Sequence, residues 1–210
     1  MGYIHNIINS LDKEEELGNL SFDERFKKPI NNKSIQLLNE NKISSKIIEE
    51  YSESDGFFIN WWKDENKKIG GELNLSPSKF LLQNEPTLKT ECDMDSEMDQ
   101  ELRYFRLFDV PTMNSQVGFF ALPNIEPSQN LYFRMVGDKW ASDLDVDIDG
   151  YFKMALASKI FFYWQIVLID IKEGTISDET KTFKKEMPKI FSDFNWDEFV
   201  ALYQSLRLSK

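Results

Sequence analysis

The segment from residue 43 to residue 82 constrains the fold more than any other part of the chain. It opens with apolar residues at helical spacing, and Asp55-Gly56 predicts the end of that helix. The aromatic run Phe57–Trp62 then predicts a strand, and Gly70-Gly71 predicts a turn before a second strand at residues 72–75. The segment contains neither Cys nor His, so it indicates a fold and not a catalytic centre.

The spacing of apolar residues predicts the remaining elements. Helices are expected at residues 4–16, 32–41, 78–82, 147–172, 178–191 and 195–206, and the Ser21-x-x-Glu24 spacing predicts a further helix that Pro29 ends. Strands are expected at residues 103–108, 116–122, 131–136 and 143–146, with turns at 109–111 and 123–127. The sequence therefore predicts an α+β fold, in which a central, mainly antiparallel sheet of about six strands is flanked by N- and C-terminal helices.

The length of 210 residues fits a single domain. Residues 1–33 are expected to form an N-terminal helical extension, residues 34–210 the domain itself, and residues 83–101 an exposed acidic loop. As a strand, this loop would line one face with carboxylates that repel one another. These carboxylates belong to Glu91, Asp93, Asp95, Glu97, Asp99 and Glu101.

The net charge of −11 restricts the classes of partner. An acidic surface repels phosphate backbones, so direct binding of nucleic acid is not expected. The same surface attracts a basic protein partner, although acidity that only keeps a monomer in solution explains the charge equally well.

Cysteine usage and the absence of targeting patterns predict a cytoplasmic protein. Cys92 is the only cysteine and cannot form an internal disulfide. The first residues lack the pattern of a signal peptide. The apolar run at residues 160–169 is shorter than the roughly 20 residues that a membrane-spanning helix needs, so no membrane contact is expected.

Candidate chemical sites are weak. His5 is the only histidine, which argues against a Ser-His-Asp or Cys-His site and against a zinc site. The string from Asp145 to Gly150 resembles the start of a calcium loop, but its twelfth position is Leu156, so its acidic residues are expected to precede a helix. Gly70-Gly71 lacks the spacing of a phosphate-binding loop. Nothing singles out a catalytic pair among the carboxylates, and no catalytic residue, cofactor or metal is predicted.

Two adjacent tryptophans are the natural candidates for a contact surface. In a strand, Trp61 and Trp62 point to opposite faces of the sheet, so one can lie in the core while the other is an interface anchor or is covered by the same chain. Trp140, Trp164 and Trp196 are expected in the core or between helices.

An ordered set of short motifs links the chain to a known family. These motifs are Tyr51-Ser-Glu-Ser-Asp55-Gly56, Phe58-Ile-Asn-Trp61, Gly71-Glu-Leu-Asn-Leu-Ser-Pro77, Tyr151, Trp164-Gln165 and Phe194-Asn-Trp-Asp-Glu-Phe-Val-Ala-Leu-Tyr203. With these pieces in order, the chain resembles the SUKH superfamily, the fold of fungal cell-wall synthesis regulators and many bacterial toxin-immunity proteins. Lys159 lies where relatives often carry a glycine, so a less interrupted long helix is expected.

The resemblance implies a cytoplasmic bacterial immunity protein that is not an enzyme. It would neutralise a cognate toxin by steric occlusion, as a monomer or weak homo-oligomer; the alternative is a regulatory scaffold for endogenous protein partners. Tyr51 and Trp61 would be core residues, and Gly56 would end a helix. If the toxin domain is basic, the expected contact residues are Trp62, Asp64, Glu65, Glu91, Asp93, Asp95, Glu97, Asp99 and Glu101.

Overall fold

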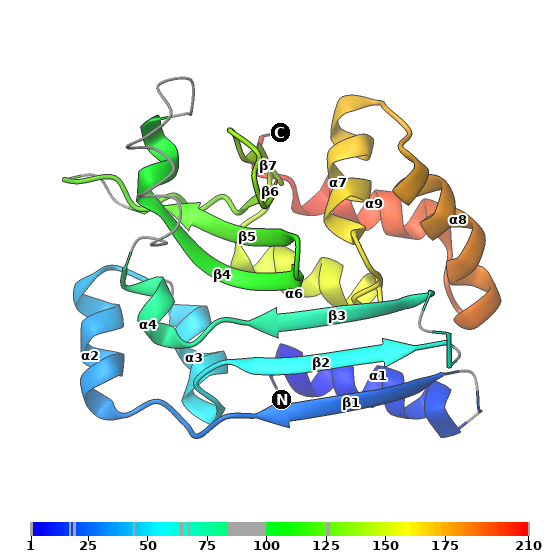
Figure 1. Cartoon of the computed structure of the whole chain (residues 1–210), viewed down its shortest axis with the longest axis horizontal. Coiled ribbons are helices and arrows are strands. Elements are labelled where there is room, and N and C mark those ends of the chain that lie inside the picture. The colour runs from blue at the N-terminus through cyan, green and yellow to red at the C-terminus, as the bar shows by residue number, and fades with distance from the viewer. Residues whose placement is uncertain are drawn as a thin grey trace.

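A computed structural model describes residues 2–16, 18, 20–43, 45–63, 65, 66, 68–83, 100–124 and 127–209 (Figure 1). The helices are α1 (Tyr3–Glu16), α2 (Asn32–Glu40), α3 (Ser45–Glu53), α4 (Ser78–Leu81), α6 (Ile148–Ala157), α7 (Trp164–Glu173), α8 (Asp178–Ile190) and α9 (Trp196–Leu206), with the 3-10 helix η1 (Gln100–Tyr104). The strands are β1 (Ser21–Phe26), β2 (Phe57–Trp62), β3 (Gly70–Leu75), β4 (Phe105–Thr112), β5 (Ser115–Phe120), β6 (Tyr132–Met135) and β7 (Ser142–Asp143).

Within the described residues, the seven strands form one antiparallel sheet in the order of the sequence. β1, β2 and β3 pair along their lengths, whereas β3 and β4 are joined at one pair, Leu75 and Asp109. Beyond that pair the two strands diverge, so β1–β3 and β4–β7 form two halves of the sheet (Figure 1). The predicted α+β class and the antiparallel sheet flanked by helices are confirmed.

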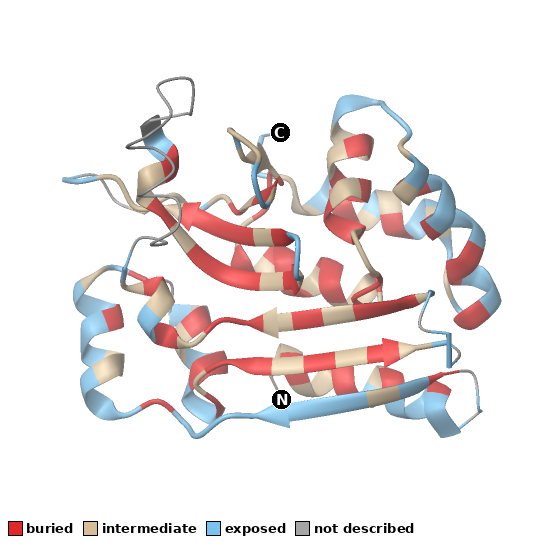
Figure 2. Ribbon diagram, in the orientation of Figure 1, coloured by how far each residue is buried: buried red, intermediate tan, exposed pale blue. Residues whose placement is uncertain are grey.

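Helices cover one face of the β1–β3 half. In Figure 1, α1 lies behind β1 and β2, and α6, which lies behind the gap between β3 and β4, contacts both α1 and α3. We call the face against these helices the inner face. Buried residues alternate with intermediate ones along β2 and β3 (Figure 2), as expected where the alternate residues of a strand point to the inner face. We call the opposite side the outer face; it consists of Asp23, Arg25, Phe58, Asn60, Trp62, Glu72 and Asn74, which are paired across the strands.

β1 is a strand where the sequence predicts a helix. The Ser21-x-x-Glu24 spacing is a local signal, and pairing with all of β2 overrides it. In the strand conformation, Phe22 points to the inner face and packs against the core. The first helix of the predicted N-terminal extension is confirmed as α1, whose Ile7 and Leu11 are fully buried.

The long helix predicted at residues 147–172 is two helices, α6 and α7. Lys159, Ile160 and Tyr163 have φ values of 50°, 50° and 60°, which a continuous helix does not contain. The intervening chain pairs with β3 instead: Phe161 forms a bridge to Gly71, and the backbone N–H of Glu72 donates to the carbonyl of Ile160 over 2.9 Å. The segment between α6 and α7 therefore lies beside the part of β3 that is not paired with β4.

Three boundaries also differ from the sequence prediction. Residues 109–111 belong to β4, where register shifts on both sides of Asp109 accommodate Pro111. β3 begins at Gly70, so the glycine pair is part of the strand and not a turn before it. β7 is shorter than the strand predicted at residues 143–146. The loop predicted at 83–101 lies largely outside the described residues.

The core contains the residues expected there. Tyr51 and Trp61 are 1% and 0% exposed, and the Trp61 indole donates to the carbonyl of Lys159 over 2.6 Å. Gly56 follows α3 with φ +95°, a conformation that side chains disfavour and glycine adopts freely. The helix therefore ends where Asp55-Gly56 predicts, within two residues.

Candidate interaction surface

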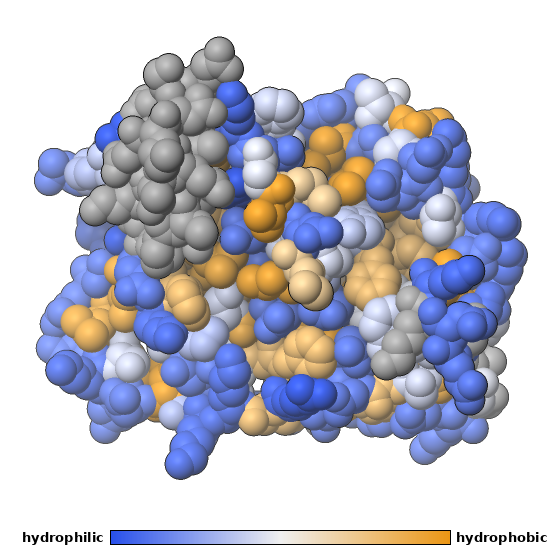
Figure 3. Space-filling view, viewed as in Figure 1, coloured by the Kyte–Doolittle hydropathy of each residue, from blue (hydrophilic) through white to orange (hydrophobic). Residues whose placement is uncertain are grey.

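The outer face presents aromatic side chains that no described helix covers in front of β1–β3 (Figure 1). Phe58, Asn60 and Trp62 are half-buried, whereas the residues between them in β2 are buried on the inner face. This alternation follows from the period of two in a strand. In Figure 3, which views the same side, hydrophobic residues lie over β2 and β3 among hydrophilic ones.

Two pairs hold the aromatic rings of this face in place. The rings of Trp62 and Phe162 lie 5.1 Å apart between centroids and are tilted by 49°. The Arg25 guanidinium lies 5.2 Å from the centre of the Phe58 ring, a cation–π contact between partners across β1 and β2. Because each ring has a fixed neighbour, the face offers ordered apolar area, which costs a partner little side-chain entropy on binding.

A groove lies beside Trp62 at the end of β1. It has a volume of about 630 Å³, and its lining includes Ser21, Asp23, Asn60, Trp62 and Glu65. Strand residues form its floor and the β2–β3 connection forms one side. Its position between a strand edge and an aromatic side chain suits an extended or hairpin segment of a protein partner.

The charges at the groove are nearly balanced. An Arg25 nitrogen lies 2.7 Å from an Asp23 carboxylate oxygen, and both side chains are largely exposed. Lys63 lies 3.4 Å from Glu186 of α8. The groove itself therefore does not select a basic partner, and any such preference has to come from the net charge of −11 on the whole chain.

A second feature of this half of the sheet is a pair of carboxyl groups that hold protons unusually well. Burial and, to a smaller extent, the nearby Asp109 carboxylate together raise the pKa of Glu72 to about 7. Burial also raises the pKa of Asp109, and hydrogen bonds from Tyr151 and from the backbone of Asn74 and Val110 offset part of this effect, so that its pKa is about 6.

Asp109 is part of a buried network that ties the two halves of the sheet to α6 and α7. Its carboxylate accepts from the Tyr151 hydroxyl of α6 and, over 2.8 Å, from the backbone N–H of Asn74 in β3. The side-chain amide of Gln165 in α7 donates to the same hydroxyl over 3.0 Å. Because the Asp109 carboxylate and the Tyr151 hydroxyl are fully buried and bonded to other groups of the protein, we interpret the network as structural.

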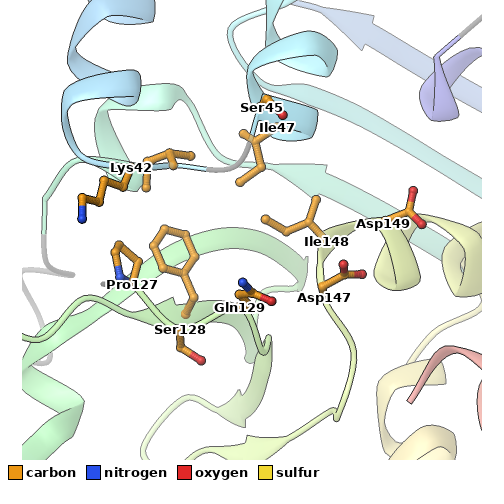
Figure 4. A pocket seen from close by; sticks show the side chains of 11 residues that line it. Lys42, Ser45, Ile47, Pro127, Ser128, Gln129, Asp147, Ile148 and Asp149 are labelled. Carbon is orange, nitrogen blue, oxygen red and sulfur yellow. The ribbon is translucent and has the colours of Figure 1, made fainter. Parts of the chain in front are cut away.

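A second cavity of about 620 Å³ lies on another part of the surface, between the starts of α3 and α6 and the segment after residue 126 (Figure 4). Ile47 and Ile148 point toward each other across it. Its carboxylates already serve the fold: Asp147 accepts from the backbone N–H of Gly150 over 2.8 Å, and Asp149 accepts from Lys153 over 2.6 Å. We therefore take the outer face and its groove as the candidate site.

The structure brings together two of the residues predicted to contact a partner. Trp62 and Glu65 both line the groove. Glu101 is exposed in η1, which contacts β5 in the other half of the sheet, so it is not part of this site. Asp64, Glu91, Asp93, Asp95, Glu97 and Asp99 lie outside the described residues.

Sequence reasoning missed two aromatic residues of the face. The alternation of β2 that separates Trp61 from Trp62 also places Phe58 outward, so Phe58 could have been found. Phe162 could not, because it reaches Trp62 only through the break between α6 and α7.

The other tryptophans follow the prediction in two cases of three. Trp164 is fully buried, and Trp196 packs against Phe183 and Phe199. Trp140 is 61% exposed, so its predicted core position is wrong. It lies in the connection between β6 and β7.

The calcium-like string is accounted for by the fold. Asp145 pairs with Arg207 over 2.6 Å, and Asp147 caps α6, so the predicted role of these residues before a helix is confirmed. Among the described residues, no cluster of three or more His, Cys, Asp and Glu side chains is placed to hold a metal ion. Likewise, no helix in the described part of the chain has both the length and the apolar character to cross a membrane.

The fold and face define an α+β protein with one antiparallel sheet and a partly open outer side. Comparisons with protein-family models, with curated proteins and with solved structures find no match.

Proposed function

We propose that the chain is a binding protein whose outer face holds a basic protein domain. In line with the resemblance to immunity proteins, we further propose that this domain belongs to a bacterial toxin, which the chain neutralises in the cytoplasm by steric occlusion. The observation that carries the proposal is the set of ordered aromatic side chains, Phe58, Trp62 and Phe162, beside a groove on the outer face.

The two physical contributions to binding have different sources. Aromatic residues in a fixed setting supply most of the affinity at protein interfaces, so Trp62 should act as the anchor. The net charge of −11 acts at longer range and raises the rate of encounter with a basic partner. The attraction comes from the charge of the whole chain, which salt screens, and not from ion pairs within the nearly neutral groove. Added salt should therefore lower the association rate much more than it raises the dissociation rate.

Co-expression tests the proposal. The chain would be paired with the toxin-like domain that the proposal expects a neighbouring gene to encode, and the readout is growth of cells that express both. We expect the wild-type chain to restore growth and Trp62→Ala to lose most of that protection. Trp140→Ala is the matched control, because it removes an exposed tryptophan from the β6–β7 turn.

Binding kinetics separate the outcomes. Removal of a central aromatic anchor should weaken binding by about 2 kcal/mol or more, mainly through faster dissociation. Equal protection by Trp62→Ala and Trp140→Ala would refute the role of the outer face. Failure of the wild-type chain to protect, together with recovery of an endogenous partner, would favour the regulatory scaffold over the immunity protein.

A further inference from the structure

Among the described strands, β1 forms an edge of the sheet, and the backbone groups that point away from β2 can be identified. The backbone N–H of Phe22 donates to the Glu15 side chain over 3.2 Å and so points away from β2. Lys27 has the opposite orientation, because its N–H and carbonyl both bond the Ser54 hydroxyl that precedes β2. Since backbone groups alternate along an antiparallel strand, those of Phe22, Glu24 and Phe26 face outward.

This alternation limits how β1 can pair with a second copy of itself. In a two-fold antiparallel pair, the residues that exchange hydrogen bonds face one another, so Phe22, Glu24 and Phe26 must be matched among themselves. Two symmetric registers overlap the strand equally. One sets Asp23 against Asp23 of the second copy on the axis, and the other sets Glu24 against Glu24.

The side chains favour the register with Glu24 on the axis. It places Asp23 opposite Arg25 of the second copy, and Arg25 opposite Asp23 of the second copy, on the outer face. On the inner face it places Phe22 opposite Phe26, which is 43% exposed in the single chain. Cross-strand pairs of opposite charge and of aromatic rings are stabilising. The other register offers neither, because it sets Arg25 against Ser21 and Phe22 against Glu24, and each register sets one pair of like charges on the axis.

We infer that the chain associates into a two-fold dimer through β1, in which the two seven-stranded sheets join and Asp23 and Arg25 form reciprocal ion pairs across the axis. This inference does not depend on the proposed function.

Two acidic residues, Glu24 and Glu15, should lower the affinity of the dimer. Glu24 faces Glu24 of the second copy, so Glu24→Gln should strengthen association. Glu15 occupies the outward N–H of Phe22 and has to swing away, which its exposed position permits. An acidic guard of this kind is a common protection of a sheet edge.

The test is sedimentation equilibrium of the full chain over a range of concentrations at about 0.15 M salt, where long-range charge repulsion is screened. We expect a concentration-dependent dimer. Arg25→Asp turns both ion pairs into repulsive pairs and should raise the dissociation constant by about tenfold or more. The double variant Asp23→Arg with Arg25→Asp restores opposite charges and should return the constant to within about threefold of wild type. Lys181→Asp, which makes the same charge change on exposed α8, is the matched control and should have little effect.

Cross-linking tests the register with chains that remain folded. With Cys92 replaced by Ser, Glu24→Cys should form an intermolecular disulfide, because a hydrogen-bonded pair on the axis has Cα atoms about 5.5 Å apart. Asp23→Cys should cross-link far less, because Asp23 faces position 25. A chain that stays monomeric at all concentrations, equal effects of Arg25→Asp and Lys181→Asp, or equal cross-linking at positions 23 and 24 would each overturn the inference.

Discussion

Replacement of Asp109 by Asn removes a carboxyl group that is 0% exposed and lies where β3 and β4 join. The amide has nearly the same shape, so the packing around it should persist. What changes is titration: burial raises the pKa of Asp109 to about 6 from an ordinary value of 3.8, whereas the amide binds no proton. The substitution therefore isolates the proton linkage of one buried group.

The sign of the effect follows from the direction of the shift. The folded protein holds the Asp109 proton more tightly than the unfolded chain, so the free energy of unfolding falls as the pH rises from 3.8 to about 6 and is level above that. At 1.36 kcal/mol for each pKa unit, the fall is about 3 kcal/mol. Glu72, whose pKa burial raises to about 7, acts in the same direction but contributes less because it is partly exposed.

Urea unfolding between about pH 4 and pH 8 measures this linkage. We expect wild type to lose stability relative to Asp109→Asn as the pH rises through this window, by an amount approaching about 3 kcal/mol. Asp178→Asn is the control. The hydrogen bond from Lys181 lowers the pKa of Asp178 from its ordinary value of 3.8, so its contribution to stability changes only below that pH, and the difference between wild type and Asp178→Asn should stay level across this window. A difference between wild type and Asp109→Asn that does not vary with pH would refute the reasoning.

Three further substitutions probe the backbone. In Gly71→Ala, a Cβ atom would lie 2.3 Å from the carbonyl oxygen of Ile160, and the crowding should cost about 3 kcal/mol and lower the melting temperature by about 10 °C; an unchanged melting temperature would show that the two segments are not packed closely. Asn195→Ala removes the cap that accepts from two backbone N–H groups of α9, and urea unfolding should show a loss of about 1 kcal/mol. Lys159→Gly should raise stability by about 1 kcal/mol, because Lys159 has φ +50°; a loss in thermal unfolding would contradict the cost assigned to this conformation.

Local signals in the sequence were enough where they agreed with the tertiary structure. Phe57–Trp62 is a run of β-forming side chains that follows the helix stop at Asp55-Gly56, and β2 has those bounds. Alternate residues of a strand point to opposite faces, which predicts that Trp61 and Trp62 are separated, and the structure places Trp61 in the core and Trp62 on the outer face. The two C-terminal helices also follow from their apolar spacing.

Local signals failed where long-range pairing decides the structure. Residues 21–26 carry a helix-start spacing, but β2 supplies a partner strand that this spacing does not reveal. Residues 158–163 are apolar enough to continue a helix, yet β3 has an unpaired edge that they complete. The groove depends on β1, and Phe162 depends on the helix break, so sequence reasoning identified only Trp62 and Glu65 of this site and could in addition have found Phe58.

The break between α6 and α7 also sets the order in which the molecule can be completed. Trp61 and Lys159, which are joined by a hydrogen bond, are 98 residues apart in sequence. The chain must therefore be synthesised nearly to α7 before the segment between α6 and α7 can lie beside β3 and before Phe162 can pack against Trp62. Closure of so large a loop is entropically costly and should come late in folding. A partner on the outer face would therefore bind finished molecules only, and at a hundredfold excess over its Kd it would add about 2.7 kcal/mol to their stability. Binding would then protect the completed chain from unfolding. Incomplete chains released early from synthesis would lack the finished outer face, so they would not compete with complete chains for the partner.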